Sequence, residues 1–163
     1  MQETQEEWCR RETGKHIRNV QKLMATALVE LEARARDHDK TKLESPEFET
    51  FVEFTPQLKG LTYGSKEYKQ ALEKLWPALK HHYEVNRHHP DHFEHGVNDM
   101  TLIDILEMLV DWKAATLRHT DGSIERSIEL NRSRFQLSPQ LAQIMLNTLK
   151  LFDVIEPELE KGE

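Results

Sequence analysis

The chain has 163 residues and 37% hydrophobic content, which is enough for one domain with a sizeable core and too little for two typical domains. Its formal net charge of -7 disfavours broad binding to phosphate backbones, so we do not expect nucleic acid as a partner. The single cysteine, Cys9, excludes an intrachain disulfide. The polar start of the chain lacks the features of a secretory signal, and no apolar run approaches the ~20 residues of a membrane span. We therefore expect a cytoplasmic protein that does not associate with membranes.

The first predicted element is a long amphipathic helix from about Thr4 to Arg36. Apolar residues recur every three or four positions between Ile17 and Leu31. His16 falls on the same stripe, so its side chain is expected to face the core. A histidine in that position is either hydrogen-bonded inside the core or a metal ligand.

Five more helical segments follow, each bounded by capping residues, proline or glycine, at about 46–55, 66–83, 102–119, 123–135 and 139–152. Thr55-Pro56 is expected to end the first of these, and Pro77 to kink the second or to start a new helix. No stretch alternates as a strand would. The sequence therefore predicts an all-α, single-domain bundle of about six helices over residues 1–152, followed by an acidic tail over 153–163.

Three separate segments carry candidate metal ligands: His16, the adjacent pair His38-Asp39, and Asp111 on the predicted helix that begins near 102. Histidine and carboxylate groups suit a divalent transition metal or magnesium. Adjacent residues on a helix point ~100° apart, so His38 and Asp39 can share one ion only near a helix end. The position of the pair, just after the first helix, permits this.

A second group of candidates lies between His81 and His95, where six of the nine histidines of the chain fall. His81, His82 and His89 are candidate ligands of a further ion, and His82 and His88 are candidates to protonate a leaving group. The alternative is that most of these side chains stack and form hydrogen bonds around a site without acting in it.

Lys42 follows Asp39 by three residues and would share its face if this stretch is helical. Its ammonium group could hold a phosphate oxygen, or it could form an ordinary surface ion pair. Both interpretations stay open at the level of sequence.

The order His16, His38-Asp39 with Lys42, and Asp111 resembles the H…HD…D signature of the HD-domain metal-dependent phosphohydrolases, including their HDxxK form. The resemblance covers about 15–115 and implies an all-α fold, one or two divalent ions, and hydrolysis of phosphate esters, often of nucleotides. The HD-GYP branch is less similar, because no histidine lies between Asp39 and His81 and the GYP letters are absent. Residues 81–93 and 104–113 also resemble a small uncharacterised group of phage and bacterial proteins.

These observations predict a metal-dependent phosphohydrolase that acts on a small phosphorylated molecule, first of all a nucleotide, by attack of metal-bound hydroxide on phosphorus. The expected ion is Mn, Co, Ni, Fe, Zn or Mg. The alternative is a regulatory helical domain that binds a nucleotide or metal without turnover. A third possibility is a metal-dependent oxygenase, since histidine and aspartate also bind iron.

Overall fold

The computed structural model describes residues 3–58, 61, 66–118 and 122–152 of the chain, and every regular element in these ranges is helical. Six α-helices and three short 3-10 helices are present there, without a strand. The prediction of an all-α chain with about six helices is thus confirmed. The chain divides into two compact units, Met1–His38 and Asp39–Glu163, where the sequence led us to expect one domain over 1–152. The predicted acidic tail, 153–163, lies outside the described residues.

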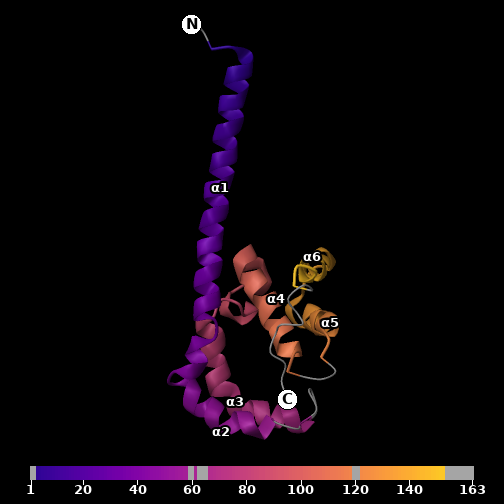
Figure 1. The fold of residues 1–163 in the computed structure, drawn as a ribbon. Coiled ribbons are helices and arrows are strands. Elements are labelled where there is room, and N and C mark those ends of the chain that lie inside the picture. Colours follow the sequence, from indigo (N-terminus) through magenta and orange to yellow (C-terminus); the bar gives the residue numbers. More distant parts are fainter. Residues whose placement is uncertain (1–2, 59–60, 62–65, 119–121, 153–163) are drawn as a thin grey trace. The chain divides into compact units, whose positions relative to one another are not determined.

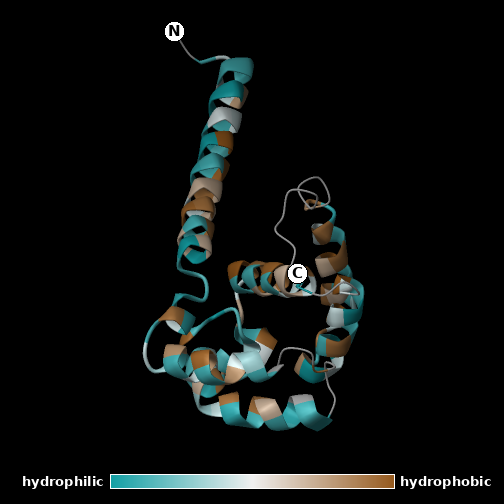
Figure 2. Ribbon diagram, turned by 60° about the horizontal axis from the view of Figure 1, so that its bottom comes forward, coloured by the Kyte–Doolittle hydropathy of each residue, from teal (hydrophilic) through white to brown (hydrophobic). Residues whose placement is uncertain are grey.

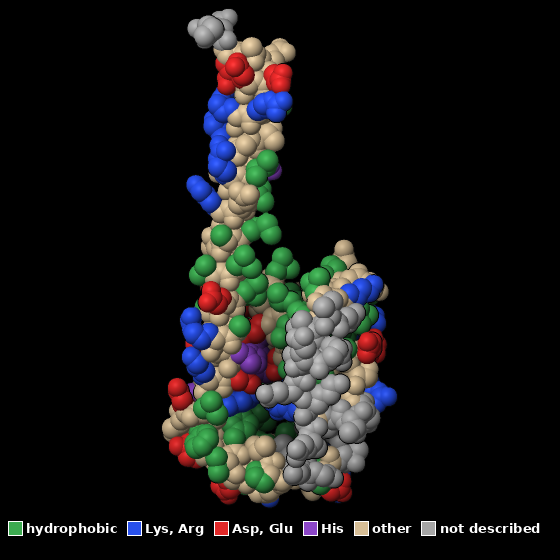
Figure 3. Space-filling model, in the orientation of Figure 1, with side chains coloured by type: hydrophobic (Ala, Val, Ile, Leu, Met, Phe, Trp, Pro, Cys, Tyr) green, Lys and Arg blue, Asp and Glu red, His purple; other side chains and the backbone are tan. Residues whose placement is uncertain are grey.

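The first unit is a single helix, α1, which runs without interruption over Gln5–Asp37 (Figure 1). It begins where the sequence predicts, because Thr4 and Glu7 form a capping box in which the Thr4 hydroxyl accepts from the Glu7 backbone N–H at 3.2 Å. Its N-terminal part carries ion pairs one turn apart, such as Glu6–Arg10 at 2.8 Å. Figure 3 shows these charged side chains at one end of α1 and apolar side chains farther along it.

The apolar side chains of α1 are exposed within this unit. Ile17, Leu23 and Leu28 are 50%, 72% and 64% exposed, and no residue of the helix is buried. Brown bands along the middle of α1 in Figure 2 mark the same stretch. His16 is exposed as well, so the prediction that it faces a core is wrong for this unit. The stripe was read correctly, but a lone helix has no second element against which to bury it.

The second unit contains the remaining elements, which are η1 (Lys40–Leu43), α2 (Glu47–Leu58), α3 (Lys66–Val85), η2 (Pro90–His92), η3 (Gly96–Asp99), α4 (Leu102–Thr116), α5 (Ile124–Phe135) and α6 (Pro139–Leu149). Helix α2 packs along α3, and η1 contacts α2. Helices α4, α5 and α6 pack on one another in chain order. The unit therefore has a helical pair, a helical triplet, and irregular chain between Asn86 and Thr101 that joins them.

The core of the triplet is a cluster of buried apolar residues: Met108, Leu109, Ile124, Ile128, Leu137, Ala142, Met145 and Leu149. Trp112 and Phe135 stack at its edge with ring centroids 6.1 Å apart. The cluster holds α4 in place from one side. The side chains of α4 that face elsewhere, among them Asp104, Glu107 and Asp111, are then free to build a polar site on a rigid support.

The sequence predicts where the helices begin more accurately than it predicts the effect of proline inside them. Thr101 and Asp104 form a capping box at the start of α4, and Ser123 and Ser138 cap α5 and α6. The prediction that Thr55-Pro56 ends α2 is wrong, because the helix continues through Pro56 to Leu58. Helix α3 likewise runs through Pro77 to Val85 without a new start. A proline removes one backbone hydrogen bond, and helix-helix packing can outweigh that loss.

No helix among the described residues combines the length and the apolarity that crossing a membrane requires.

Replacing Met145 with alanine is expected to lower the free energy of unfolding by roughly 2–5 kcal/mol, because the side chain is 1% exposed in the α4–α6 core and its loss leaves a cavity. Ile144→Ala is the matched control, since the neighbouring residue of the same helix is 52% exposed. It should change stability by about 0.5 kcal/mol or less. Urea unfolding followed by circular dichroism measures both, and equal effects would contradict the packing of α6 described above.

Candidate metal centre

Asp39, the first residue of the second unit, has a left-handed backbone conformation with φ of 56°. Aspartate tolerates this region better than most residues, because its short polar side chain can form local hydrogen bonds. Asp39 is the N-cap residue of η1. The expectation that the His38-Asp39 pair lies at a helix end is confirmed, because His38 is the C-cap of α1.

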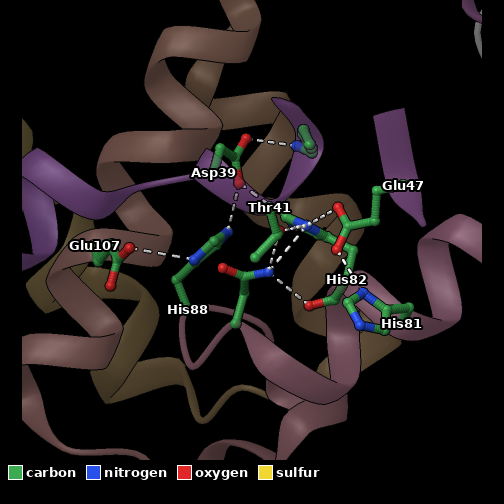
Figure 4. Close-up of polar contacts among 9 residues, drawn as sticks. Asp39, Thr41, Glu47, His81, His82, His88 and Glu107 are labelled. Atoms are coloured by element: carbon green, nitrogen blue, oxygen red, sulfur yellow. Dashed lines mark hydrogen bonds and ion pairs between the residues drawn. The ribbon is translucent and has the colours of Figure 1, made fainter. Parts of the chain in front are cut away.

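Three histidines of the second unit come together, and two of them contact the Asp39 carboxylate. His82 is on the last turns of α3, while His88 and His89 lie in the irregular segment that follows that helix. One ring nitrogen of each lies within 4.8 Å of those of the other two. Asp39 Oδ1 is 3.2 Å from His82 Nε2 and 3.4 Å from His88 Nε2 (Figure 4). The three imidazoles and this carboxylate oxygen thus form one compact cluster.

Buried carboxylates bind the opposite ring nitrogens of two of these histidines. His82 Nδ1 donates to Glu47 Oε2 at 2.9 Å, and His88 Nδ1 lies 3.2 Å from Glu107 Oε1. Glu47 is fully buried and Glu107 is 10% exposed. In Figure 4, Glu107 and Glu47 lie on the sides of the two imidazoles that are away from Asp39. A carboxylate on Nδ1 fixes the ring orientation and leaves the lone pair on Nε2, as in many metal sites.

Two of the clustered nitrogens have no hydrogen bond. His82 Nε2 and His89 Nε2 are buried, and neither finds a partner of good geometry among the described residues. Leaving a buried polar atom unsatisfied costs about 1–3 kcal/mol, so such atoms are rare in folded proteins. With Nδ1 of His82 donating to Glu47, its Nε2 lone pair faces a carboxylate oxygen at 3.2 Å. Two acceptors at that distance repel each other unless a proton on Nε2 or a metal ion lies between them, and the residues present fit a bound metal ion.

The pKa values of His89 and Asp39 favour the protonation states in which these side chains bind metal ions. Burial, with His88 and His82 as neighbours, lowers the pKa of His89 to about 3, although Asp111 acts in the opposite direction. The imidazole is therefore neutral near pH 7, which is the form that binds metals. Burial raises the pKa of Asp39, but contacts with His82, His88 and Lys42 outweigh it and hold that pKa well below its usual range. Asp39 is thus a carboxylate, the form that a ligand requires.

Lys42 and Asp111 complete the surroundings of Asp39. Lys42 Nζ donates to Asp39 Oδ2, the oxygen that does not face the histidines. Of the two interpretations of Lys42, the ion pair is present, and its partner is the candidate ligand itself. A carboxylate oxygen of Asp111, on α4, lies within 4.8 Å of an oxygen of Asp39. The HD aspartate and the distant helical aspartate of the sequence pattern are therefore brought together.

Two of the predicted ligands, His16 and His81, do not join this cluster. His16 and His38 lie 22 residues apart along one helical segment, which corresponds to about 33 Å at 1.5 Å per residue, so they cannot bind the same ion. His81 is 39% exposed on its side chain, and its Nδ1 donates to Glu47 Oε1 at 2.8 Å. His81 thus supports the carboxylate behind His82. His38 belongs to the first unit and adjoins the cluster through its peptide bond to Asp39.

Four residues of the site were missed at the level of sequence: Thr41, Glu47, Asn86 and Glu107. Asn86 donates to Thr41 Oγ1 at 3.0 Å and to the His82 carbonyl at 2.9 Å, which joins η1 to the end of α3. Glu107 could have been selected, because it precedes Asp111 by one helical turn. Glu47 carries no such signal, since an acidic residue in the first turn of a helix is ordinarily a surface residue.

Replacing His89 with glutamine is expected to flatten the pH dependence of stability of the metal-free protein. Because the pKa of His89 falls from 6.5 to about 3 on folding, the unfolded chain binds more protons between these values, and stability decreases as the pH drops through them. Near pH 5 the free energy of unfolding should change by about 1 kcal/mol per pH unit more steeply in the native chain than in the variant. Urea unfolding across this window measures both slopes, and equal slopes would contradict a buried, neutral His89.

Comparison with known proteins identifies the family of the chain and nothing about its activity. No curated protein and no solved structure matches it significantly. A model of a family of unknown function, DUF5662, matches residues 5–151, which include all of α1 to α6 and every residue of the cluster. Since the match spans most of the chain, this protein belongs to the DUF5662 family.

Proposed function

We propose that the second unit binds a divalent transition-metal ion and hydrolyses a small phosphate ester. The observation that carries the proposal is the convergence of His82, His88 and His89, two of which contact the carboxylate of Asp39, with two buried imidazole nitrogens left without a hydrogen bond among the described residues. His82, His88, His89 and Asp39 would hold the ion, with Asp111 beside them. The resemblance to HD-domain phosphohydrolases supports the same chemistry, because Asp39 and Asp111 are the HD and final aspartates of that pattern.

The donor set narrows the choice of ion. Three imidazole nitrogens favour manganese, iron, cobalt, nickel or zinc, whereas magnesium prefers oxygen ligands and a shell of water. Of the ions expected from sequence, magnesium is therefore disfavoured. When bound, such an ion would lower the pKa of a coordinated water and polarise a phosphoryl oxygen.

The residues around the cluster would position the substrate. Lys42 uses one N–H on Asp39, and its side chain is 35% exposed, so its remaining donors can reach a phosphate oxygen. Thr41 and Asn86 hold η1 against the end of α3 and so keep Lys42 near the imidazoles, while Glu47 holds His82 from α2. Nucleotides are the first substrates to test, because the resemblance to HD domains implies them.

The nitrogen-rich donor set also favours a second candidate, an iron-dependent oxygenase, since imidazole and carboxylate together are typical of non-haem iron. Iron in the purified protein, and oxygen uptake on addition of a polyol or a phosphonate, would select it. Tight binding of a nucleotide without turnover under any ion would select the regulatory domain instead.

One test of the proposed function separates the ligands that the structure favours from those that only the sequence pattern suggests. Asp39→Asn and His88→Gln should each lose most of the bound metal, measured by elemental analysis of the purified full chain, and with it the hydrolysis of phosphate esters in the presence of manganese, cobalt, nickel or zinc. His16→Gln should keep both, because His16 lies about 33 Å from the residue before Asp39. Loss of metal in His16→Gln with retention in His88→Gln would reverse the assignment.

A second prediction concerns Glu47, which supports His82 from behind. Glu47→Gln keeps the size of the side chain but removes the charge that holds His82 Nδ1, and it should weaken metal binding by about 10–100-fold. The control is Glu49→Gln, an exposed residue in the same first turn of α2. Competition with a chelator of known affinity measures the change, and unaltered affinity in Glu47→Gln would remove Glu47 from the centre.

A further inference from the structure

Three consecutive residues after α3 face three acidic residues of α4. Arg87 pairs with Asp104, His88 Nδ1 lies 3.2 Å from Glu107, and Asp111 acts electrostatically on His89. The acidic positions are spaced by three and four residues, so they form one face of α4. The second and third of these interactions belong to the candidate metal centre, the third as an electrostatic effect on the pKa of His89. The first, between Arg87 and Asp104, involves no candidate ligand.

The Arg87–Asp104 contact is built as a fixed anchor. Arg87 Nε and Nη2 donate to the two oxygens of Asp104 at 3.2 and 3.0 Å, which is the two-point geometry of a strong arginine–carboxylate pair. Asp104 is fully buried and also accepts from the backbone N–H and the hydroxyl of Thr101, each at 2.8 Å. The Arg87 guanidinium lies over the Phe93 ring, 4.8 Å from its centroid. Both partners are therefore held in position by further contacts.

The segment that carries His88 and His89 needs such an anchor. Helix α3 ends at Val85 and η2 begins at Pro90, so backbone hydrogen bonds of a regular element do not fix the orientation of the two histidines. Asn86 holds one end of the segment through Thr41 and His82. Arg87, the residue after Asn86, binds Asp104 at the start of α4, one turn before Glu107.

We infer that Arg87 and Asp104 are positioning residues of the metal centre: their ion pair sets where His88 and His89 lie relative to Glu107 and Asp111. This inference rests on the proposed metal centre and adds to it residues that touch neither ion nor substrate. A ligand held too loosely binds its ion less tightly, because ordering it then costs conformational entropy on binding.

The test measures cobalt binding to the full chain, by the visible absorption of bound Co²⁺ and by competition with a chelator. Asp104→Asn removes the charge but keeps an oxygen for Thr101, and Arg87→Lys keeps the charge but loses the two-point geometry. Each should weaken Co²⁺ binding about tenfold and change the shape of the absorption bands, while far-ultraviolet circular dichroism stays that of the native chain. The double variant should bind no more weakly than Asp104→Asn alone, because both changes break one contact.

Thr101→Ala is the matched control. It removes the hydroxyl that caps α4 and one of the donors to Asp104 but leaves the Arg87–Asp104 pair, so it should weaken Co²⁺ binding clearly less than Asp104→Asn does. Native affinity and native absorption in Asp104→Asn and Arg87→Lys would overturn the inference, and so would an equal loss in Thr101→Ala, which would assign the effect to the start of α4. If the native chain binds no Co²⁺, or Asp39→Asn binds it as tightly, the proposed function fails as well, whereas failure of the Arg87 and Asp104 variants alone leaves it standing.

Discussion

The carboxylate of Asp39 is the group on which the polar interior of the second unit depends. One of its oxygens faces the ring nitrogens of His82 and His88, and the other accepts from Lys42. Removing most of a carboxylate from water is costly unless cations or donors surround it, and here they come from η1, from α3 and from the segment after α3. Asp39 makes these contacts from the N-cap position of η1, where its backbone is left-handed.

Several acidic residues of the same region orient neighbouring side chains at a cost in folding stability. Glu47, Asp104 and Glu107 are acidic side chains that are buried or nearly so, and each binds a basic group that either belongs to the imidazole cluster or adjoins it. Apolar residues of similar size would pack these positions at lower cost, because burying charge carries a desolvation penalty. Sites of this kind are where a fold departs from the rules that favour stability, and such departures are concentrated at functional centres. The apolar α4–α6 core supplies the rigid support that makes the arrangement possible.

Helix α1 shows how far the resemblance to HD domains extends. The HD pair and the final aspartate of that pattern have clear counterparts in Asp39 and Asp111, which the second unit brings together. The first histidine of the pattern does not, because His16 stands on an uninterrupted helix about 33 Å before His38. In its place the second unit offers His82, His88 and His89, which come from a single stretch of chain. The metal centre proposed above therefore uses no residue from the middle of α1.

Local sequence determined most of the secondary structure of this protein. Capping residues such as Thr4, Thr101 and Ser138 start helices where predicted, because a side-chain oxygen next to the first turn satisfies free backbone N–H groups whatever the rest of the chain does. Candidate ligands were also visible, since histidine is rare enough for six of them within fifteen residues to stand out.

Only the tertiary structure decided which of these residues act together. Periodicity places His16 on an apolar stripe but does not say whether another element covers it, and it gives no reason to bury Glu47. Those outcomes depend on long-range packing of α2 on α3 and of the segment after α3 on α4. The contacts join residues 17 to 49 positions apart, and no local pattern encodes such a distance, because side-chain partners are set by how helices pack rather than by how each one forms.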